Sequence, residues 1–341
     1  MSKGLVLVTG ATGFLGTEVA IAYAEAGYTV RGTARSQQKV KDWETFNPKY
    51  KGKIQWFIAD LNSPNGFDEA IKGVKYIAHT ASPFTYDFKD NENDMLKPAI
   101  EGTKIIMEAA KKEPSVEHVV ITSSFAAIFD LPKLPNPGHT YTRKDWNPAT
   151  YEEAAKSDNN AYVYCASKVL AERAAWDDKE HRFYITTICP PLIIGPPRQP
   201  VKNMAGLNTS NADIYNLING NSSDPVPATS TPVAVDVRDV ALLHVRAVED
   251  PSAQNQRILC IAFHIFNFQI VEILRNAFSS SPSKLARVKS GSGLDKPFEH
   301  YATDSRDGEE LLGKPWITPE VCYKETAERL WELEEMLKAF P

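Results

Sequence analysis

Tyr164 and Lys168 are the residues whose types and spacing most directly indicate chemistry. They lie four positions apart in a segment with a helical pattern, so we expect the phenol and the ammonium on one helix face. A tyrosine ordinarily exchanges its proton poorly at neutral pH, but a nearby cation stabilises the phenolate form. The pair could therefore give a proton to a reacting oxygen atom. By itself this spacing is a weak signal, because any exposed helix can contain it.

A run of hydroxyl side chains, Thr122-Ser123-Ser124, ends a predicted strand 40 residues before Tyr164. The carboxyl ends of strands in a doubly wound sheet face the ligand crevice. A serine hydroxyl there could hydrogen-bond a substrate carbonyl beside the tyrosine. Neighbouring residues of a strand point to opposite sides, and this alternation does not choose between Ser123 and Ser124.

The segment from Thr9 to Gly16 reads T-G-A-T-G-F-L-G between a predicted strand and a predicted helix. Gly10 permits a tight turn, Gly13 permits close approach of the backbone to a pyrophosphate, and Gly16 permits close packing of helix on sheet. The helix N-terminus offers N–H groups and a positive dipole end to phosphates. The alternative is a plain strand–helix turn, but three glycines in this context favour a dinucleotide site.

The end of the second predicted strand indicates which dinucleotide is bound. NAD sites normally place a carboxylate there, on the ribose 2′-hydroxyl. This chain instead has Arg35 just past the strand and Lys39 one helical turn later. Two cations suit a 2′-phosphate, which favours NADPH. The alternative is a solvated basic loop that binds no phosphate. Asp60 and Leu61 end the third strand, where Asp60 could reach adenine or could cap a helix.

Short apolar runs alternate with helical patterns through the first half of the chain, which predicts an α/β fold with a doubly wound parallel sheet. The predicted strands span residues 5–8, 28–33, 54–59, 74–79, 119–123 and 185–189. The predicted helices between them include residues 13–26, 98–112 and 162–177.

The alternation stops after Pro190. Residues 190–232 are rich in Pro, Asn, Ser and Gly, which is typical of loops that shape a substrate site. A strand at 233–237 and a helix at 239–248 are predicted to return to the sheet. We therefore expect a dinucleotide-binding domain at 1–190, with a return segment near 233–262, and a smaller substrate lobe mainly at 191–341.

Composition excludes several classes of protein. The chain has 341 residues, 43% of them hydrophobic, and a net charge of −5, so nothing global favours nucleic acid or anionic membrane. It has no apolar stretch long enough for a membrane span and no recognisable signal peptide. The four cysteines lack C-x-x-C spacing, and no histidine pair has metal-ligand spacing. We expect a cytoplasmic protein without a metal site, either monomer or homodimer.

Several longer stretches carry a resemblance to a known family. They include V-T-G-A-T-G-F-L-G, G-T-A-R-S, H-T-A-S-P-F, V-I-T-S-S-F-A-A-I-F-D, D-W-N-P-A-T, Y-C-A-S-K-V-L-A-E-R-A-A-W and V-D-V-R-D-V-A. Through them the chain resembles extended short-chain dehydrogenases/reductases of the dihydroflavonol-reductase-like branch. It is most similar to fungal NADPH-dependent methylglyoxal and carbonyl reductases.

The resemblance implies roles for individual residues. It implies that Ser124 is the catalytic serine, Tyr164 the proton donor and Lys168 the residue that binds the ribose and tunes Tyr164. Phe84, Phe125 and Leu192 match positions that wall the substrate pocket. The implied cofactor contacts, besides Tyr164 and Lys168, are Gly10, Ala11, Thr12, Gly13, Phe14, Leu15, Arg35, Lys39, Asp60, Leu61, Thr80, Ala81, Ser82, Pro190, Ile193 and Ser210.

The implied activity is NADPH-dependent reduction of aldehydes or ketones, with small to medium hydrophobic carbonyl compounds as substrates. The chain departs from the family pattern at Cys189, where asparagine is frequent, and at Leu192, where an aromatic residue can occur. Two alternatives remain open. One is a sugar-nucleotide epimerase or dehydratase with bound NAD, and the other is a non-enzymatic NADP(H) sensor.

Overall fold

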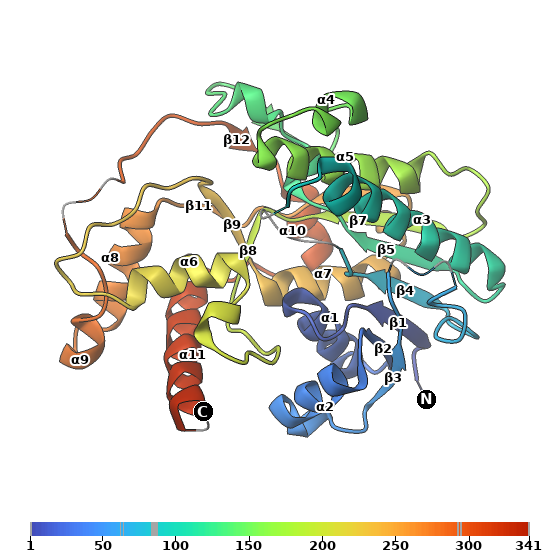
Figure 1. Ribbon diagram of the computed structural model, residues 1–341, viewed down its shortest axis with the longest axis horizontal. Helices are drawn as coiled ribbons and strands as arrows, with labels where there is room; N and C mark the ends of the chain where they lie inside the picture. Colours follow the sequence, from blue (N-terminus) through green and yellow to red (C-terminus); the bar gives the residue numbers. More distant parts are fainter. Residues whose placement is uncertain are drawn as a thin grey trace.

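A seven-stranded parallel sheet forms the centre of the computed structural model, which describes residues 2–61, 63, 65–82, 88–291, 293 and 295–339. The strand order is β10-β7-β5-β4-β1-β2-β3 (Figure 1). These strands are β1 (Leu5–Thr9), β2 (Thr29–Ala34), β3 (Ile54–Ile58), β4 (Tyr76–His79), β5 (His118–Thr122), β7 (Tyr184–Cys189) and β10 (Gln256–Leu259). The order reverses between β1 and β4, which opens a crevice at their carboxyl ends. The predicted doubly wound sheet is confirmed.

Helices cover both faces of this sheet because its central strands are apolar on both sides. Leu7 and Ile77 pack under α3 (Lys97–Lys112) and α5 (Asn160–Trp176). Val6 and Val8 pack under α1 (Phe14–Glu25) and α7 (Val237–Glu249), whose residues share one core cluster with them. A further helix, α2 (Gln37–Phe46), follows β2, and its Trp43 joins the same cluster.

The segment that was predicted to return to the sheet does so only in part. The strand β9 (Val233–Asp236) pairs with β8 (Leu192–Ile194) and β11 (Phe263–His264) in a separate three-stranded sheet, so its predicted place in the main sheet is wrong. The chain bends after β7, at Pro190 and Pro191, and β9 pairs with β8 beyond this bend instead of with the main sheet. The following helix α7 does pack on α1, and β10 completes the main sheet.

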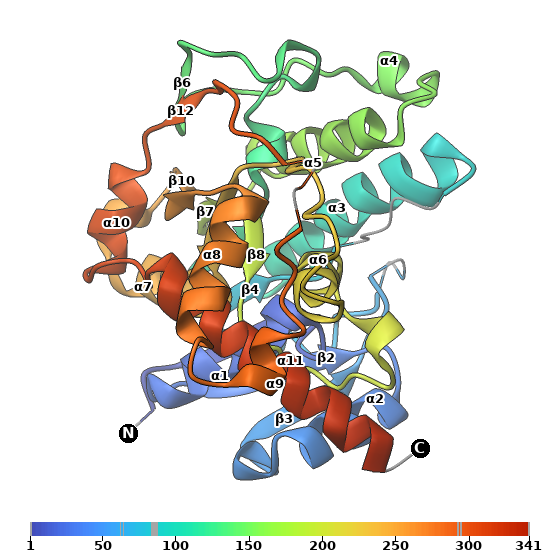
Figure 2. The same ribbon diagram turned by 90° about the vertical axis from the view of Figure 1, so that its left-hand side faces the viewer.

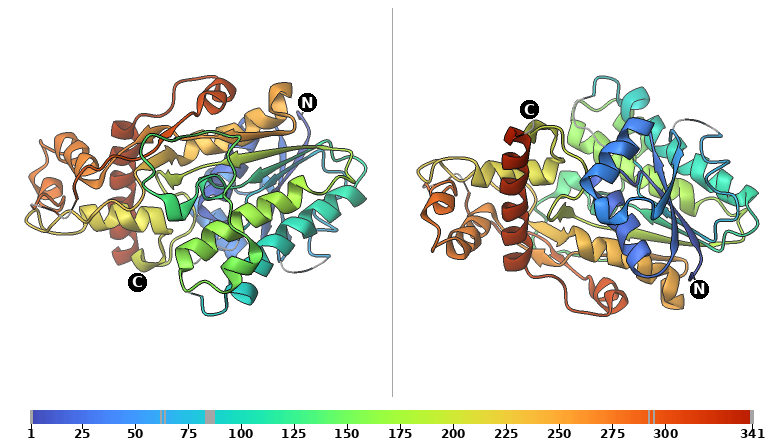
Figure 3. Two further views of the ribbon diagram at one scale, coloured as in Figure 1. Left: turned by 90° about the horizontal axis from the view of Figure 1, so that it is seen from above. Right: turned by 90° about the horizontal axis from the view of Figure 1, so that it is seen from below.

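The three-stranded sheet and four helices make a small lobe with its own apolar core. These helices are α6 (Thr209–Ile218), α8 (Asn267–Ala277), α9 (Pro282–Leu285) and α11 (Pro319–Ala339). The last helix, α11, packs against both α6 and α8, and the small lobe lies at one end of the main sheet (Figures 2 and 3).

Shorter elements complete the chain. They are β6 (Thr140–Tyr141), β12 (Ala302–Thr303), α4 (Tyr151–Ala155) and α10 (Arg306–Leu312), with β6 and β12 paired in a two-stranded sheet. Within the described ranges, no helix combines the length and the apolar character that a membrane crossing requires.

Candidate active site

The turn between β1 and α1 is shaped to hold phosphate groups. Gly10 adopts φ +65°, a left-handed conformation that favours glycine. A Cβ atom on Gly16 would lie 2.2 Å from the Gly10 carbonyl oxygen, so α1 can start this close to β1 only with glycine there. Gly13 is the N-cap of α1 and has no side chain to accept the first N–H groups, and the first turn carries no acidic residue. The helix end therefore presents donors and a positive dipole to an anion.

A cleft of about 620 Å³ opens from this turn along the carboxyl ends of the strands. Ten of the predicted cofactor contacts line it, namely Gly10, Thr12, Gly13, Arg35, Lys39, Asp60, Leu61, Thr80, Ala81 and Ser82. Asn208, from the start of α6, also lines it and was not predicted. The cleft is thus formed by the carboxyl ends of the strands, by residues of α2 and α3, and by one residue of the small lobe.

The other predicted contacts support the cleft or lie beside it. Ala11 is buried, and its N–H donates to the Thr33 carbonyl at 3.0 Å. Phe14 and Leu15 are half-buried in the first turn of α1, and Pro190 is buried at the end of β7. Ser210 donates its hydroxyl hydrogen to the carbonyl oxygen of Ile193 at 2.6 Å, which fixes α6 on β8.

The cleft is basic beside the end of β2. Ser36 caps α2 by accepting from the Lys39 N–H at 3.3 Å, which places Lys39 in the first turn of α2, close to Arg35. Partial burial, followed by the positive charges of Arg35 and Lys202, lowers the pKa of Lys39. Lys202 comes from the loop after β8, and sequence reasoning missed it because only the fold brings it here. Three mutually repelling cations make this end of the cleft suitable for a multiply charged anion.

At the other end, α5 presents the tyrosine–lysine pair. The Lys168 ammonium donates to the Ser82 hydroxyl at 2.6 Å and lies 5.2 Å from the centre of the Tyr164 ring. Burial lowers the pKa of Lys168 from its ordinary 10.5 to about 8. His79, at the end of β4, is buried, and its Nδ1 lies 2.9 Å from the Thr9 hydroxyl.

The two serines left open by strand alternation have different partners. Ser123 donates to Glu172 Oε2 at 2.7 Å and is held in a buried cluster. The Ser124 oxygen accepts from the Ala126 N–H at 3.1 Å and begins the short turn at Phe125–Ala127, which packs against α5. The geometry therefore favours Ser124, because the Ser123 hydroxyl proton is already committed to a carboxylate.

Glu172 is the centre of a polar cluster that the sequence did not reveal. Its carboxylate accepts from Arg257 Nε at 2.7 Å and from the Thr187 hydroxyl at 2.7 Å. The exposed fractions of the Glu172 and Arg257 side chains are 0% and 8%, and the Arg257 guanidinium lies 3.6 Å from the Trp146 ring centre. The cluster joins α5, β7 and β10 to Ser123, which directly follows β5 and precedes Ser124.

The three predicted substrate-pocket residues have different surroundings. Phe84 lies outside the described residues. Phe125 is only 1% exposed and packs against the rings of Phe129, Tyr141 and Tyr301, so it supports the site from behind and offers little surface to a ligand. Leu192 does line a cavity, in the small lobe. Among the described residues, no three His, Cys, Asp or Glu side chains are grouped to hold a metal ion.

The sequence matches one family model, the NAD dependent epimerase/dehydratase family, over residues 6–262. A putative oxidoreductase of Schizosaccharomyces pombe is 42% identical, covering 99% of this chain and all of the relative. The NADPH-dependent methylglyoxal reductase of Saccharomyces cerevisiae is 32% identical, covering 96% of this chain and 98% of the relative.

Solved structures of fungal reductases are also similar to this chain. The yeast methylglyoxal/isovaleraldehyde reductase complexed with NADPH has a TM-score of 0.85 and 29% identity, covering 97% of this chain and 99% of that one. A Candida albicans homologue in complex with NADPH has a TM-score of 0.86 and 31% identity, covering 96% and 98%. The resemblance to fungal reductases is thereby confirmed, and the chain belongs to the NAD dependent epimerase/dehydratase family.

Proposed function

We propose that this protein is an NADPH-dependent reductase that converts aldehydes or ketones to alcohols. The observation that carries the proposal is a single cleft with Arg35 and Lys39 near one end and Ser82 near the other. The Lys168 ammonium donates to Ser82 and lies beside the Tyr164 ring. One end suits the 2′-phosphate of NADPH and the other suits proton transfer to a carbonyl oxygen. Relatives named as NADPH-dependent methylglyoxal reductases support the same reading.

The residues present fit the cofactor. Gly10, Gly13 and the N-terminus of α1 would hold the pyrophosphate, and Arg35, Lys39 and Lys202 would hold the 2′-phosphate. Asp60 and Leu61 would lie near adenine, and Lys168 would bind the ribose. When bound, NADPH supplies the hydride that reduces the carbonyl carbon.

The chain's own residues supply position, charge and a proton. Ser124 would donate a hydrogen bond to the carbonyl oxygen and orient it, and Tyr164 would give its phenolic proton to that oxygen as the carbon is reduced. The Lys168 cation would stabilise the phenolate that remains, while Ser82 orients the ammonium at 2.6 Å. The tyrosine would then recover its proton from solvent.

A sugar-nucleotide epimerase on the same fold is the main alternative, because one epimerase of Bacillus cereus shares the fold, with a TM-score of 0.70 at 16% identity. The basic end of the cleft disfavours it, since bound NAD would place a ribose hydroxyl there and not a phosphate. A sensor without activity is disfavoured by the presence of Ser124, Tyr164 and Lys168 together.

The test measures NADPH oxidation by the purified protein with dicarbonyls, aliphatic aldehydes and aryl ketones, and identifies the alcohol product by mass spectrometry. Turnover with matching alcohol formation supports the proposal. Tight NADPH binding without turnover would favour the sensor. Release of stoichiometric NAD from the freshly purified, denatured protein would favour the epimerase.

We also propose that residues 1–190, with the return through α7 and β10, act as the dinucleotide-binding domain, and that residues 191–341 mainly bind substrate. The separate core of the small lobe supports this division. The proposed compartment is the cytoplasm, which a fluorescent fusion expressed in the source cell would test.

A further inference from the structure

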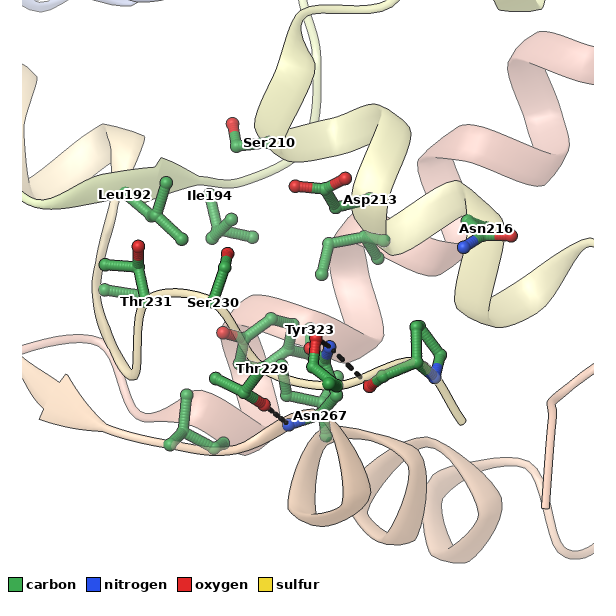
Figure 4. Close-up of a pocket in the computed structure, with 16 residues that line it drawn as sticks. Leu192, Ile194, Ser210, Asp213, Asn216, Thr229, Ser230, Thr231, Asn267 and Tyr323 are labelled. Atoms are coloured by element: carbon green, nitrogen blue, oxygen red, sulfur yellow. Dashed lines mark hydrogen bonds between the residues drawn. The ribbon is translucent and has the colours of Figure 1, made fainter. Parts of the chain in front are cut away.

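A second cavity, of about 140 Å³, lies in the small lobe between α6, the three-stranded sheet and the loop at 227–231 (Figure 4). Its lining includes the apolar residues Leu192, Ile194, Ile214, Ala234, Ile265 and Ile270, together with several hydroxyl and amide side chains. Its size is close to that of cavities of about 150 Å³ that hold a benzene molecule. The cavity can therefore take a group of about the size of one aromatic ring.

This cavity is close to the reacting end of the cleft. The N–H of Phe125, the residue after Ser124, donates to the carbonyl oxygen of Pro190 at 2.8 Å. Leu192, which lines the cavity, is two residues beyond Pro190, and two residues span about 7 Å at most. The Leu192 wall of the cavity is therefore only two residues from the carbonyl group that holds the backbone next to Ser124.

One charged side chain faces the cavity. Asp213 is exposed at its mouth, and Figure 4 shows the carboxylate directed from α6 over Leu192 and Ile194, with Ser230 and Thr231 on the facing loop. The surrounding protein shields this carboxylate enough to raise its pKa. No lysine or arginine is among the described residues that line the cavity. The cavity thus combines apolar, hydroxyl and amide side chains with one negative charge at its rim.

We propose that this cavity binds the substituent of the carbonyl substrate, and that Asp213 selects substituents ending in a hydrogen-bond donor, above all an ammonium group, against those ending in a carboxylate. The inference rests on the proposed reductase function and names the substrate class that the same site accepts. Asp213 acts as a specificity-determining residue that contacts the far end of the substrate.

The test uses ketones that differ only at that far end. 4-Acetylbenzylammonium, 4-methylacetophenone and 4-acetylbenzoate have one ring and one acetyl group, and differ in charge. We expect the wild-type ratio of kcat/KM for the ammonium over the carboxylate compound to be about tenfold or more. The Asp213→Asn variant should lower this ratio by about tenfold, and Asp213→Lys should reverse the order, because each charge contact at a partly exposed site changes binding by about three- to fivefold.

Glu272→Gln is the matched control, because Glu272 is an exposed acidic residue of the same lobe that does not line this cavity. An unchanged ratio of kcat/KM for the ammonium over the carboxylate compound in Asp213→Asn would overturn the inference. An equal change of this ratio in Glu272→Gln would also overturn it. In either case, turnover of 4-methylacetophenone would still support the reductase function. If the wild type oxidised NADPH with none of the three ketones, the reduction of aryl ketones and the inference would both be wrong.

Discussion

At the residue scale, the chemistry depends on the environment of Lys168. Its ammonium lies between the Ser82 hydroxyl and the Tyr164 ring, and burial lowers its pKa to about 8. The side chain is therefore mostly protonated at neutral pH but close to losing its proton. The Lys168 ammonium can therefore stabilise the Tyr164 phenolate at neutral pH, and a modest rise in pH removes its charge.

Activity should consequently fall in mild alkali. Below about pH 8 Lys168 is charged, and above it the neutral amine no longer stabilises the phenolate, so kcat/KM for NADPH should decrease as the pH rises through about 8. Initial rates in buffers of constant ionic strength measure this. The Lys168→Arg variant keeps its charge throughout and should lose the decrease. A wild-type profile that stays flat to pH 9.5 would contradict the assignment.

Tyr164 and its neighbour Tyr162 provide a matched pair of substitutions on α5. Tyr164→Phe removes the proposed proton donor and should lower kcat by about 10²- to 10⁴-fold with NADPH affinity retained. Tyr162→Phe removes only a hydroxyl that donates to Glu153 at 3.1 Å, and should leave kcat within about twofold. Single-turnover oxidation of NADPH separates this effect from binding. Equal rates in the two variants would exclude Tyr164 as the donor.

At the scale of elements, the β1–α1 turn requires glycine at a precise place. Gly16→Ala would set a Cβ atom 2.2 Å from the Gly10 carbonyl oxygen, so α1 must move away from the sheet. We expect NADPH affinity to fall at least about tenfold, since the helix N-terminus leaves the phosphate position. Titration of NADPH into the protein, followed by fluorescence, measures this affinity. Gly206→Ala is the control, because its added Cβ atom would lie 3.6 Å from the nearest atom. Unchanged affinity in Gly16→Ala would refute this role of the turn.

The cluster around Glu172 holds four elements together behind the reacting residues. Glu172→Gln would leave the Arg257 guanidinium buried without its counter-charge, which costs about 3 kcal/mol of the free energy of unfolding. Glu325→Gln alters the half-exposed pair with Arg238 and should cost under about 1 kcal/mol. Urea denaturation followed by circular dichroism compares them. Similar losses in both variants would show that the buried pair has no special role in stability.

The sequence predicted those elements whose signal is local. The six predicted strands of the main sheet are short runs in which apolar and β-branched residues dominate, and each appears within a few residues of its expected place. The strands β8, β9 and β11 are two to four residues long, and their pairing depends on the bend at Pro190, so no local pattern revealed the separate sheet. The same limit applies to Phe125, whose burial follows from the aromatic rings that the fold gathers around it.

At the scale of the whole molecule, the cleft is completed by a loop that joins the two parts of the chain. Arg198, in the loop after β8, forms an ion pair with Glu18 of α1 at 3.2 Å, and its carbonyl oxygen accepts from the Asn47 side chain at 3.0 Å. These contacts hold Lys202 and Asn208 near the basic end. Neither residue could be predicted as part of this site, because they are far along the chain from Arg35 and Lys39.

The cofactor preference is the most direct test of the proposed function, because it depends on the fold, the cleft and the proposed reaction together. The measurement is the ratio of kcat/KM for NADPH over NADH, with any carbonyl compound that the enzyme reduces. Two or more charge-assisted hydrogen bonds to a 2′-phosphate predict a ratio of about 100 or more, and a loss of most of it in Arg35→Ala. A ratio near one, or a preference for NADH, would contradict the assignment of Arg35 and Lys39 and the proposed function with it.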